Sequence, residues 1–396
     1  MMIIGKTRIW QDYEKEIATD NFYYVRSCIR QNFFPGSESA FLKIMRDILG
    51  KNVFEDPRHS TCSGIGYHGD IVPIETTQTI VARHFAMMKE QGYENYVASC
   101  VTSFGIYTEF LDMWEHFPET KEQTAKYLKE ATGREFTLPK NLVHTSDVVY
   151  KLRHEIAEKS KFKLINKNTG QPLKVVEHIG CHYGKMFPKS SIGGAEFPQV
   201  LAEMVRAWGG EVIDYPERRH CCGFGFRQYL VQANRGFSIA NSYKKFESME
   251  PYKPDFIVAN CPGCAMFLDK WQYAIAEMEN RTFDENGNGI PVLTYEEMAA
   301  LVLGFDPWET GLQMHQINCE PLLDKIGITY DIEKKFTGLS GEQMQPPQQP
   351  ECFNYNTRHC NYDFESRKNV IARAKPEVIQ TIKDSLLHSD NNEIKP

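Results

Sequence analysis

The sequence predicts an α/β protein made of two repeated modules, each a small parallel sheet flanked by helices, followed by a C-terminal extension. Short apolar runs alternate with segments of helical length, which is typical of parallel strands joined by helical crossovers. Three cysteine landmarks also recur at nearly constant spacing. Cys28 and Cys181 are 153 residues apart, Cys62 and Cys222 are 160 apart, and Cys100 and Cys261 are 161 apart. Such a recurrence indicates an internal repeat.

The length of 396 residues suits two domains and an appendage. We predict an N-terminal segment over 1–20, a first module over 21–145, a second module over 146–333, and a linker with a C-terminal extension over 334–396. The linker is inferred from a Gln- and Pro-rich stretch at 345–350. The extension contains three candidate ligands: Cys352, His359 and Cys360. We favour a role in clasping a partner protein over a metal site there, and assign no role to Cys319.

The first module reads as a series of short strands that each lead to a cysteine. The expected elements are an apolar run at 22–25 before Cys28, a helix at 40–49, a run at 51–57 before Cys62, and a run at 96–99 before Cys100. Residues 112–150 are charged with little apolar periodicity, so we expect a helical connection there.

The first module lacks two cysteines that the second module has. Thr61 stands where the first residue of a cysteine pair is expected, and Ser103 where the last cysteine is expected. The survivors are Cys28, Cys62 and Cys100. Two interpretations stay open. Either these three thiolates hold a smaller or site-open cluster, with His59, His68 or an outside ligand, or the module binds nothing and packs against its neighbour.

The second module contains five cysteines in three clusters that each follow an apolar run: Cys181, then Cys221 and Cys222, then Cys261 and Cys264. Because the carboxyl ends of parallel strands meet at one edge of a sheet, we expect the clusters to converge. Five thiolates favour an iron–sulfur cluster, since tetrahedral zinc takes four ligands. A disulfide framework fits poorly, because 11 cysteines in 396 residues are too sparse for a small stapled domain.

Two other motif matches are set aside. Residues 64–69 spell G-x-G-x-x-G, but the match overlaps the Cys62 loop and lacks the acidic residue that a dinucleotide site requires further on. We interpret its glycines as allowing the backbone close to a cluster. Residues 284–289 resemble the opening of a calcium loop, yet Tyr295 occupies the position of the bidentate glutamate, so a plain turn is expected.

The cysteine pattern resembles the cysteine-rich CCG domain of the heterodisulfide reductase B-subunit family. That pattern is a Cys, then Cys-Cys-Gly, then Cys-x-x-Cys at a similar interval; here the intervals are 40 residues (Cys181 to Cys221) and 39 (Cys222 to Cys261). The resemblance covers about residues 20–320 and implies that these five cysteines hold a noncubane [4Fe-4S] cluster. With one complete set and a long tail, the chain looks nearest the heterodisulfide reductase-like complexes of sulfur oxidisers.

The resemblance also implies an activity, namely the reduction or formation of disulfide or thiol substrates, which include carrier-bound sulfur. His182, Lys185 and Arg227 flank the expected ligands and are candidates to donate protons or neutralise a thiolate product, or to serve as structural neighbours. Two alternatives are kept: an electron-transfer protein without its own substrate, as in aromatic acyl-CoA reductase complexes, and a scaffold with a structural metal.

Electrons must pass between this chain and other polypeptides, because the sequence has no C-x-x-C-x-x-C run of the ferredoxin type and no persuasive flavin or nicotinamide motif. The partners implied by the resemblance are the ferredoxin-like C subunit and the flavoprotein A subunit of such complexes. A net charge of −7 argues against nucleic acid. No apolar stretch approaches the ~20 residues of a membrane span, so we expect a cytoplasmic protein.

Overall fold

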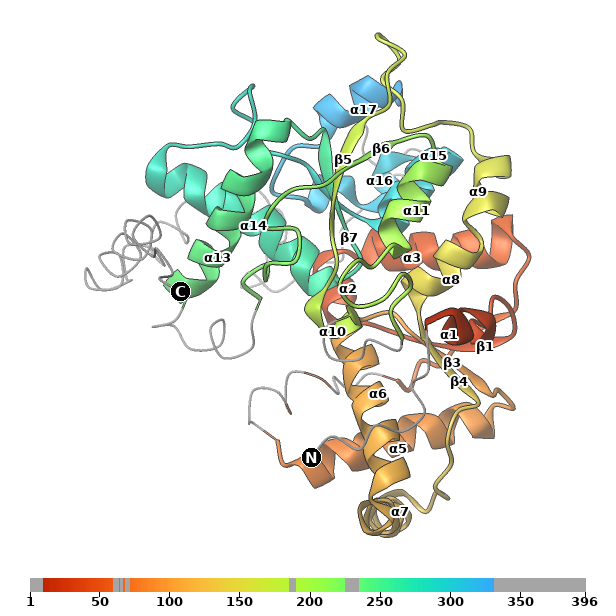
Figure 1. The fold of residues 1–396 in the computed structure, drawn as a ribbon. Coiled ribbons are helices and arrows are strands. Elements are labelled where there is room, and N and C mark those ends of the chain that lie inside the picture. The colour runs from red at the N-terminus through yellow and green to blue at the C-terminus, as the bar shows by residue number, and fades with distance from the viewer. Residues whose placement is uncertain are drawn as a thin grey trace, which may run out of the picture.

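The computed structural model describes residues 10–59, 64, 67, 72–184, 190–224 and 235–330. These residues form two four-stranded parallel sheets with helices around them (Figure 1). The predicted α/β class with a repeated parallel sheet is confirmed. The predicted extension at 334–396 lies outside the described residues.

The two sheets have the same strand order and the same register. The first sheet has the order β2-β1-β3-β4, with strands β1 (Phe22–Val25), β2 (Val53–Glu55), β3 (Asn95–Ala98) and β4 (Asn141–His144). The second has the order β6-β5-β7-β8, with strands β5 (Lys174–His178), β6 (Glu211–Ile213), β7 (Phe256–Ala259) and β8 (Val292–Thr294). Val25 pairs with Ala98 in the first sheet, and His178 pairs with Ala259 in the second. These two pairs therefore occupy equivalent positions.

Of the central strands, β1 and β7 are buried along their whole length and β3 and β5 everywhere except at their first residue, as in sheets covered on both faces. Around the first sheet lie α1 (Trp10–Glu16), α2 (Cys28–Phe33), α3 (Pro35–Lys43) with a π-helical continuation (Ile44–Ile48), α5 (Ile74–Glu90), α6 (Val101–His116), α7 (Pro118–Thr132), α8 (Thr145–Lys151) and α9 (Arg153–Lys159). Around the second lie α10 (Cys181–Gly184), α11 (Val200–Ala207), α13 (Arg235–Met249), a 3₁₀ turn (Glu250–Tyr252), α14 (Pro262–Glu279), α15 (Tyr295–Leu303), α16 (Pro307–Thr310), a second 3₁₀ turn (Leu312–Met314) and α17 (Glu320–Ile326).

Strand β4 corrects the expectation of an all-helical connection over 112–150. Helices α6 and α7 occupy its first part, but Asn141–His144 pair in parallel with β3. The strand is short and polar at both ends, and its first two residues are only half-buried. For this reason its sequence lacks the apolar pattern by which strands are recognised.

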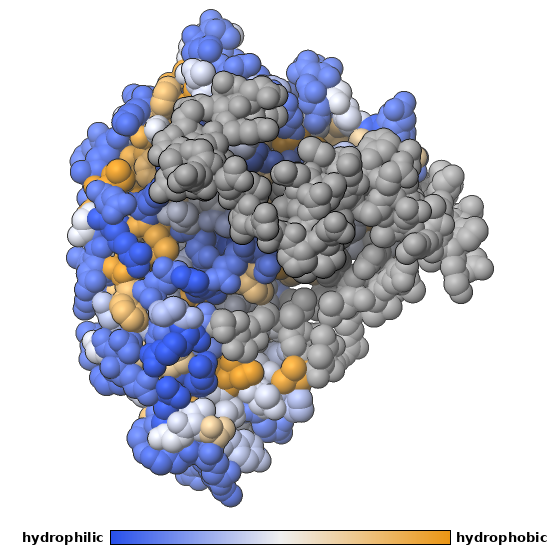
Figure 2. Space-filling view, turned by 180° about the vertical axis from the view of Figure 1, so that it is seen from behind, coloured by the Kyte–Doolittle hydropathy of each residue, from blue (hydrophilic) through white to orange (hydrophobic). Residues whose placement is uncertain are grey.

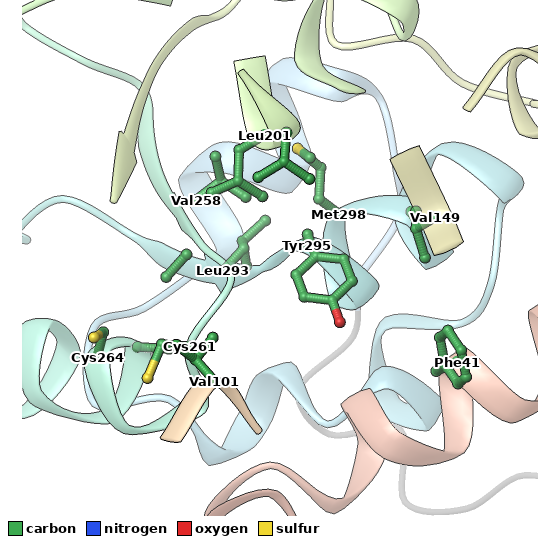
Figure 3. Close-up of a cluster of buried hydrophobic side chains, with 14 of the residues drawn as sticks. Phe41, Val101, Val149, Leu201, Val258, Cys261, Cys264, Leu293, Tyr295 and Met298 are labelled. Carbon is green, nitrogen blue, oxygen red and sulfur yellow. The ribbon is translucent and has the colours of Figure 1, made fainter. Parts of the chain in front are cut away.

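The helix that follows the fourth strand of each sheet packs against a helix of the other sheet. After β4, α8 contacts α11, which precedes β6. After β8, α15 contacts α3, which precedes β2. This helix exchange joins the two sheets through a single apolar core (Figure 3).

Polar contacts follow the same exchange. Arg30 of α2 forms a fully buried ion pair with Glu296 of α15. In the opposite direction, Tyr183 of α10 donates a hydrogen bond to Asp147 of α8. The buried Tyr295 hydroxyl donates to Thr145 Oγ1 at 2.5 Å, which joins the first residues of α15 and α8.

The described surface seen from behind is mostly hydrophilic with scattered apolar side chains (Figure 2). Among the described helices, we find none that combines the length and the apolar character needed to cross a lipid bilayer.

Candidate metal centre

The ends of β5 and β7 place two of the three cysteine clusters at one sheet edge. Cys181 begins α10 three residues after β5, and Cys261 is the N-cap of α14, whose first turn contains Cys264 (Figure 3). The Gly180 amide donates to Asn260 Oδ1 at 2.8 Å, which ties the two loops together. A Cβ on Gly180 would lie 2.7 Å from the Cys261 Cβ, so only glycine allows this approach.

The third cluster is held by hydroxyl groups of α13. Ser242 Oγ donates to the Cys222 carbonyl at 2.5 Å, and Ser238 donates to the carbonyl of Gly223. Gly223 has φ +87°, and a Cβ there would lie 2.2 Å from the Ser238 carbonyl oxygen. The glycine of the Cys-Cys-Gly sequence is therefore required both by its backbone angle and by the closeness of α13.

Lys245, one turn further along α13, fixes the segment that leads to Cys221. Its Nζ donates to the Tyr215 hydroxyl at 2.9 Å and to the carbonyls of Glu217 at 2.6 Å and Arg218 at 3.1 Å. Burial lowers the pKa of Lys245 to about 7, although the nearby Cys222 and Cys264 act in the opposite direction. This lysine is a buried amine beside the sulfurs, and the sequence did not single it out.

Contacts join four of the five sulfurs, and the charge of the fifth, Cys181, acts on Cys221. Hydrogen bonds from Cys221 and Cys264 lower the pKa of Cys222, and the same contacts raise the pKa values of Cys221 and Cys264. Cys261 contacts Cys264. The predicted convergence of the three clusters thus agrees with the described geometry, whereas metal binding by these residues stays a prediction.

His178 is the site residue that the sequence reading missed. One of its ring nitrogens lies within 4.8 Å of the Cys222 and Cys264 sulfurs, which also lie within that distance of each other. All three side chains are buried, as is Cys261, whereas Cys181 and Cys221 are half-buried. The sequence feature that could have identified His178 is its position at the end of the apolar run of β5, three residues before Cys181.

The donor set fits a soft metal. Sulfur ligands in a group shielded from water match iron–sulfur clusters and thiolate-bound zinc, and metal binding would remove the thiol protons. Buried Lys245 would partly balance the negative charge that five thiolates bring.

Of the three candidate proton donors predicted from the sequence, only His182 lies among the described residues. His182 is buried at the contact of α10 with α6, and its Nδ1 lies 3.4 Å from Thr102 Oγ1 of the first module. Lys185 and Arg227 lie outside the described residues. Arg219 is described; it is half-buried, and the charge of Cys181 acts on its guanidinium.

In the first module, two of the three remaining cysteines are described. Cys28 begins α2 and Cys100 is the N-cap of α6, whereas Thr61, Cys62 and His68 lie outside the described residues. His59 is buried with its ring 3.9 Å from that of His84, and burial lowers the pKa of both imidazoles. No described group in this module brings three metal-ligating side chains together.

The cysteine loops of the two halves meet. Helix α10, which begins at Cys181, packs on α6, which follows Cys100, and α14 packs on α2, which begins at Cys28. Gly180 lies close both to Cys261 and to Val101 of the first module, and Figure 3 draws those two side chains together. Both cysteine-bearing edges therefore border the same interface.

The region with the complete cysteine set matches a known domain family. Residues 175–269, from β5 into α14, match the CCG family, described as a cysteine-rich domain. The chain therefore contains a CCG cysteine-rich domain.

Relatives extend the match beyond this domain. The chain is 26% identical over 312 residues to the B subunit of a ferredoxin:CoB-CoM heterodisulfide reductase from Methanosarcina acetivorans, a match that covers 76% of this chain and 95% of that protein. It is 28% identical over 301 residues, with the same coverage, to the B subunit of a ferredoxin/F(420)H(2)-dependent CoB-CoM heterodisulfide reductase from that organism. The resemblance to the heterodisulfide reductase B-subunit family is thereby confirmed.

One solved structure shares the fold. A hypothetical protein from Helicobacter pylori superposes with a TM-score of 0.55 at 14% sequence identity, over 80% of this chain and 58% of that chain. At this identity the similarity shows the fold alone.

Proposed function

We propose that the chain is the iron–sulfur subunit of a heterodisulfide reductase-like redox complex, with a noncubane [4Fe-4S] cluster in its second module. The proposed ligands are Cys181, Cys221, Cys222, Cys261 and Cys264. The observation that carries the proposal is the buried group of Cys222 and Cys264 with His178, in which Cys222 also contacts Cys221 and Cys264 also contacts Cys261. The similarity to heterodisulfide reductase B subunits over most of their length supports it independently.

When bound, such a cluster supplies single electrons and iron atoms at which a substrate sulfur can bind. The residues of this chain hold and shield it. Cys222, Cys261 and Cys264 form the buried side, while the half-buried Cys181 and Cys221 mark the side open to a substrate. Arg219 is half-buried and feels the charge of Cys181, which supports a proposed role in neutralising a thiolate product.

The reaction class that follows is the reduction or formation of disulfide or thiol groups, with carrier-bound sulfur as one substrate class. Breaking a disulfide takes two electrons, which single-electron centres must deliver in two steps. The proposed partners are therefore a ferredoxin-like C subunit and a flavoprotein A subunit. The relatives are named as B subunits of ferredoxin-linked reductases, which supports the exchange of electrons with other polypeptides.

A second candidate is an electron-transfer protein without its own substrate. The position of His182 favours it, because this side chain is buried at the module interface with its Nδ1 3.4 Å from Thr102 Oγ1. Binding of thiol substrates to the purified protein separates the two candidates: a substrate-induced change in the cluster spectrum favours catalysis, and no change favours transfer alone.

The proposed cluster is tested by purification under anaerobic conditions. We expect about four irons and matching acid-labile sulfide per chain for the second module, with a paramagnetic signal in one redox state. Cys222→Ser should remove this iron. Cys319→Ser is the matched control, because Cys319 is equally buried but lies outside the sulfur group.

Zinc at these sulfurs, or metal-free protein from anaerobic cells, would contradict the proposal. The same preparations test the first module. Iron that survives Cys222→Ser but disappears with Cys100→Ser indicates a smaller or site-open cluster there, whereas absence of residual iron indicates a packing role.

A further inference from the structure

His178 belongs to the sulfur group by position but is absent from the cysteine pattern. It is 2% exposed, and a ring nitrogen lies within 4.8 Å of the Cys222 and Cys264 sulfurs. Its Nδ1 has no hydrogen-bond partner among the described residues. The ring is in hydrogen-bonding contact with the Cys222 side chain. A buried N–H without an acceptor costs about 1–3 kcal/mol, so the neutral imidazole is best satisfied when it directs its one N–H to that sulfur and leaves Nδ1 unprotonated.

The internal repeat supplies a comparison within the same chain. The strand register makes Val25 the counterpart of His178, because each pairs with the alanine that precedes a cysteine loop. The half that lacks two cysteine positions has an apolar residue there, and the half with all five has an imidazole. Strand burial alone therefore does not require the histidine, since valine fills the same position.

The chemistry favours hydrogen-bond donation over ligation. Five thiolates are already available to the metal, and a neutral imidazole has one N–H to place. A sulfur that accepts a hydrogen bond loses electron density, which stabilises the more negative, reduced state of an iron–sulfur cluster and raises its reduction potential.

We propose that His178 donates a hydrogen bond to the metal-bound sulfur of Cys222 and thereby raises the reduction potential of the cluster in the second module. The inference rests on the proposed function, because it requires a cluster at these sulfurs. His178 is a positioning residue here: it acts through Cys222 and does not contact substrate.

The test is a redox titration, followed by electron paramagnetic resonance, of the anaerobically purified full chain. His178→Val introduces the residue of the equivalent position and removes the donor; we expect unchanged iron and sulfide with a more negative midpoint potential. His178→Asn keeps an N–H donor and should shift the potential less. If the valine variant does not fold, the asparagine variant and the wild type still test the idea. In both proteins the paramagnetic signal of the cluster should show coupling to a proton, and this coupling should disappear when the solvent is exchanged for deuterium oxide.

An unchanged potential in a fully loaded His178→Val protein would overturn the inference and leave the proposed function standing. So would a strongly coupled nitrogen signal in the wild type that the valine variant loses together with iron, because that result makes His178 a ligand. Absence of a cluster from the wild-type protein instead contradicts the proposed function, and the inference falls with it.

Discussion

The two halves of this molecule have the same sheet but different chemistry. Strand order and register agree between them. At equivalent positions, however, the first half has Val25 where the second has His178, and Ser103 where the second has Cys264. The first sheet keeps its buried strands without the full cysteine set. The comparison teaches that the apolar strands build the fold and that the cysteines and their histidine are additions at its edge.

The helix before the third strand shows the same division of labour. At the spacing of 161 residues that relates Ala98 to Ala259, His84 of α5 is the counterpart of Lys245 of α13. The His84 ring packs at a tilt against the His59 ring, whereas Lys245 holds the loop before Cys221. One position is used for packing in the first half and for site construction in the second.

The largest expected effect concerns the contacts that cross between the sheets. Arg30→Met leaves the buried Glu296 carboxylate without its charge partner, so we expect the free energy of unfolding in urea to fall by about 3–5 kcal/mol. The double variant Arg30→Met, Glu296→Met should recover most of this loss, because no unpaired charge remains. Equal stability of the single variant and the wild type would show that this ion pair does not hold the sheets together.

The next effect separates the cysteine loops from ordinary turns. Gly223→Ala combines a positive φ with a backbone clash against Ser238, so we expect a loss of about 3 kcal/mol together with the iron of the second module. Gly50→Ala is the control, since its φ is +64° but nothing lies within 4 Å of the added Cβ. It should cost about 1 kcal/mol and leave iron unchanged. Equal iron content in both variants would break the comparison.

A smaller effect depends on pH and contrasts two buried groups. His315 pairs with Glu297 in the first turn of α15, and Asp147 lies in the first turn of α8. Burial opposes the charge of His315, but the adjacent Glu297 carboxylate prevails and raises the pKa of His315 to about 9. Burial raises the pKa of Asp147 to about 7. The stability from His315 is complete below its ordinary pKa of 6.5 and is lost as pH rises through 9. That from Asp147 is complete below 3.8 and is lost as pH rises through 7.

His315→Gln should therefore lower the unfolding free energy by about 2 kcal/mol near neutral pH, with the difference closing as pH rises past the His315 pKa. Denaturation across that pH range measures it. A difference that grows with pH would contradict the assignment of a charged His315.

The smallest effect is expected at the Tyr183–Asp147 hydrogen bond, which crosses between the halves in the opposite direction to the Arg30–Glu296 ion pair. Tyr183→Phe removes the hydrogen bond to Asp147 and the long one, 3.3 Å, that the Ile192 amide donates to the Tyr183 hydroxyl, while Asp147 keeps those from the Tyr13 hydroxyl and the His144 amide. We expect a loss of about 1 kcal/mol in urea unfolding. A loss as large as that of Arg30→Met would show that the two crossings are energetically equal, contrary to their different charge.

Much of this architecture is visible in the sequence because it depends on local patterns. Apolar runs before Cys28, Cys181 and Cys261 predicted strands, and the constant cysteine spacing predicted the repeat. The convergence of the cysteine clusters followed from the geometry of parallel sheets.

The parts that could not be predicted depend on tertiary contacts. Strand β4 has too few apolar residues to show a strand period, and the packing of α8 and α15 on helices of the opposite half leaves no local signal. In the sequence, His178 and Lys245 look like ordinary polar residues. Only the fold shows that the end of β5 and one face of α13 bring them close to the sulfurs.

The helix exchange bears on how such a chain could arise. A polypeptide that stopped after α8 would leave the buried surface of α3 uncovered, and α8 itself would have no α11 to pack against. Two copies could satisfy both needs by a symmetric swap of their last helices, in the manner of an isologous dimer. Joining those copies end to end would give the present arrangement, in which each half covers the exposed helix of the other.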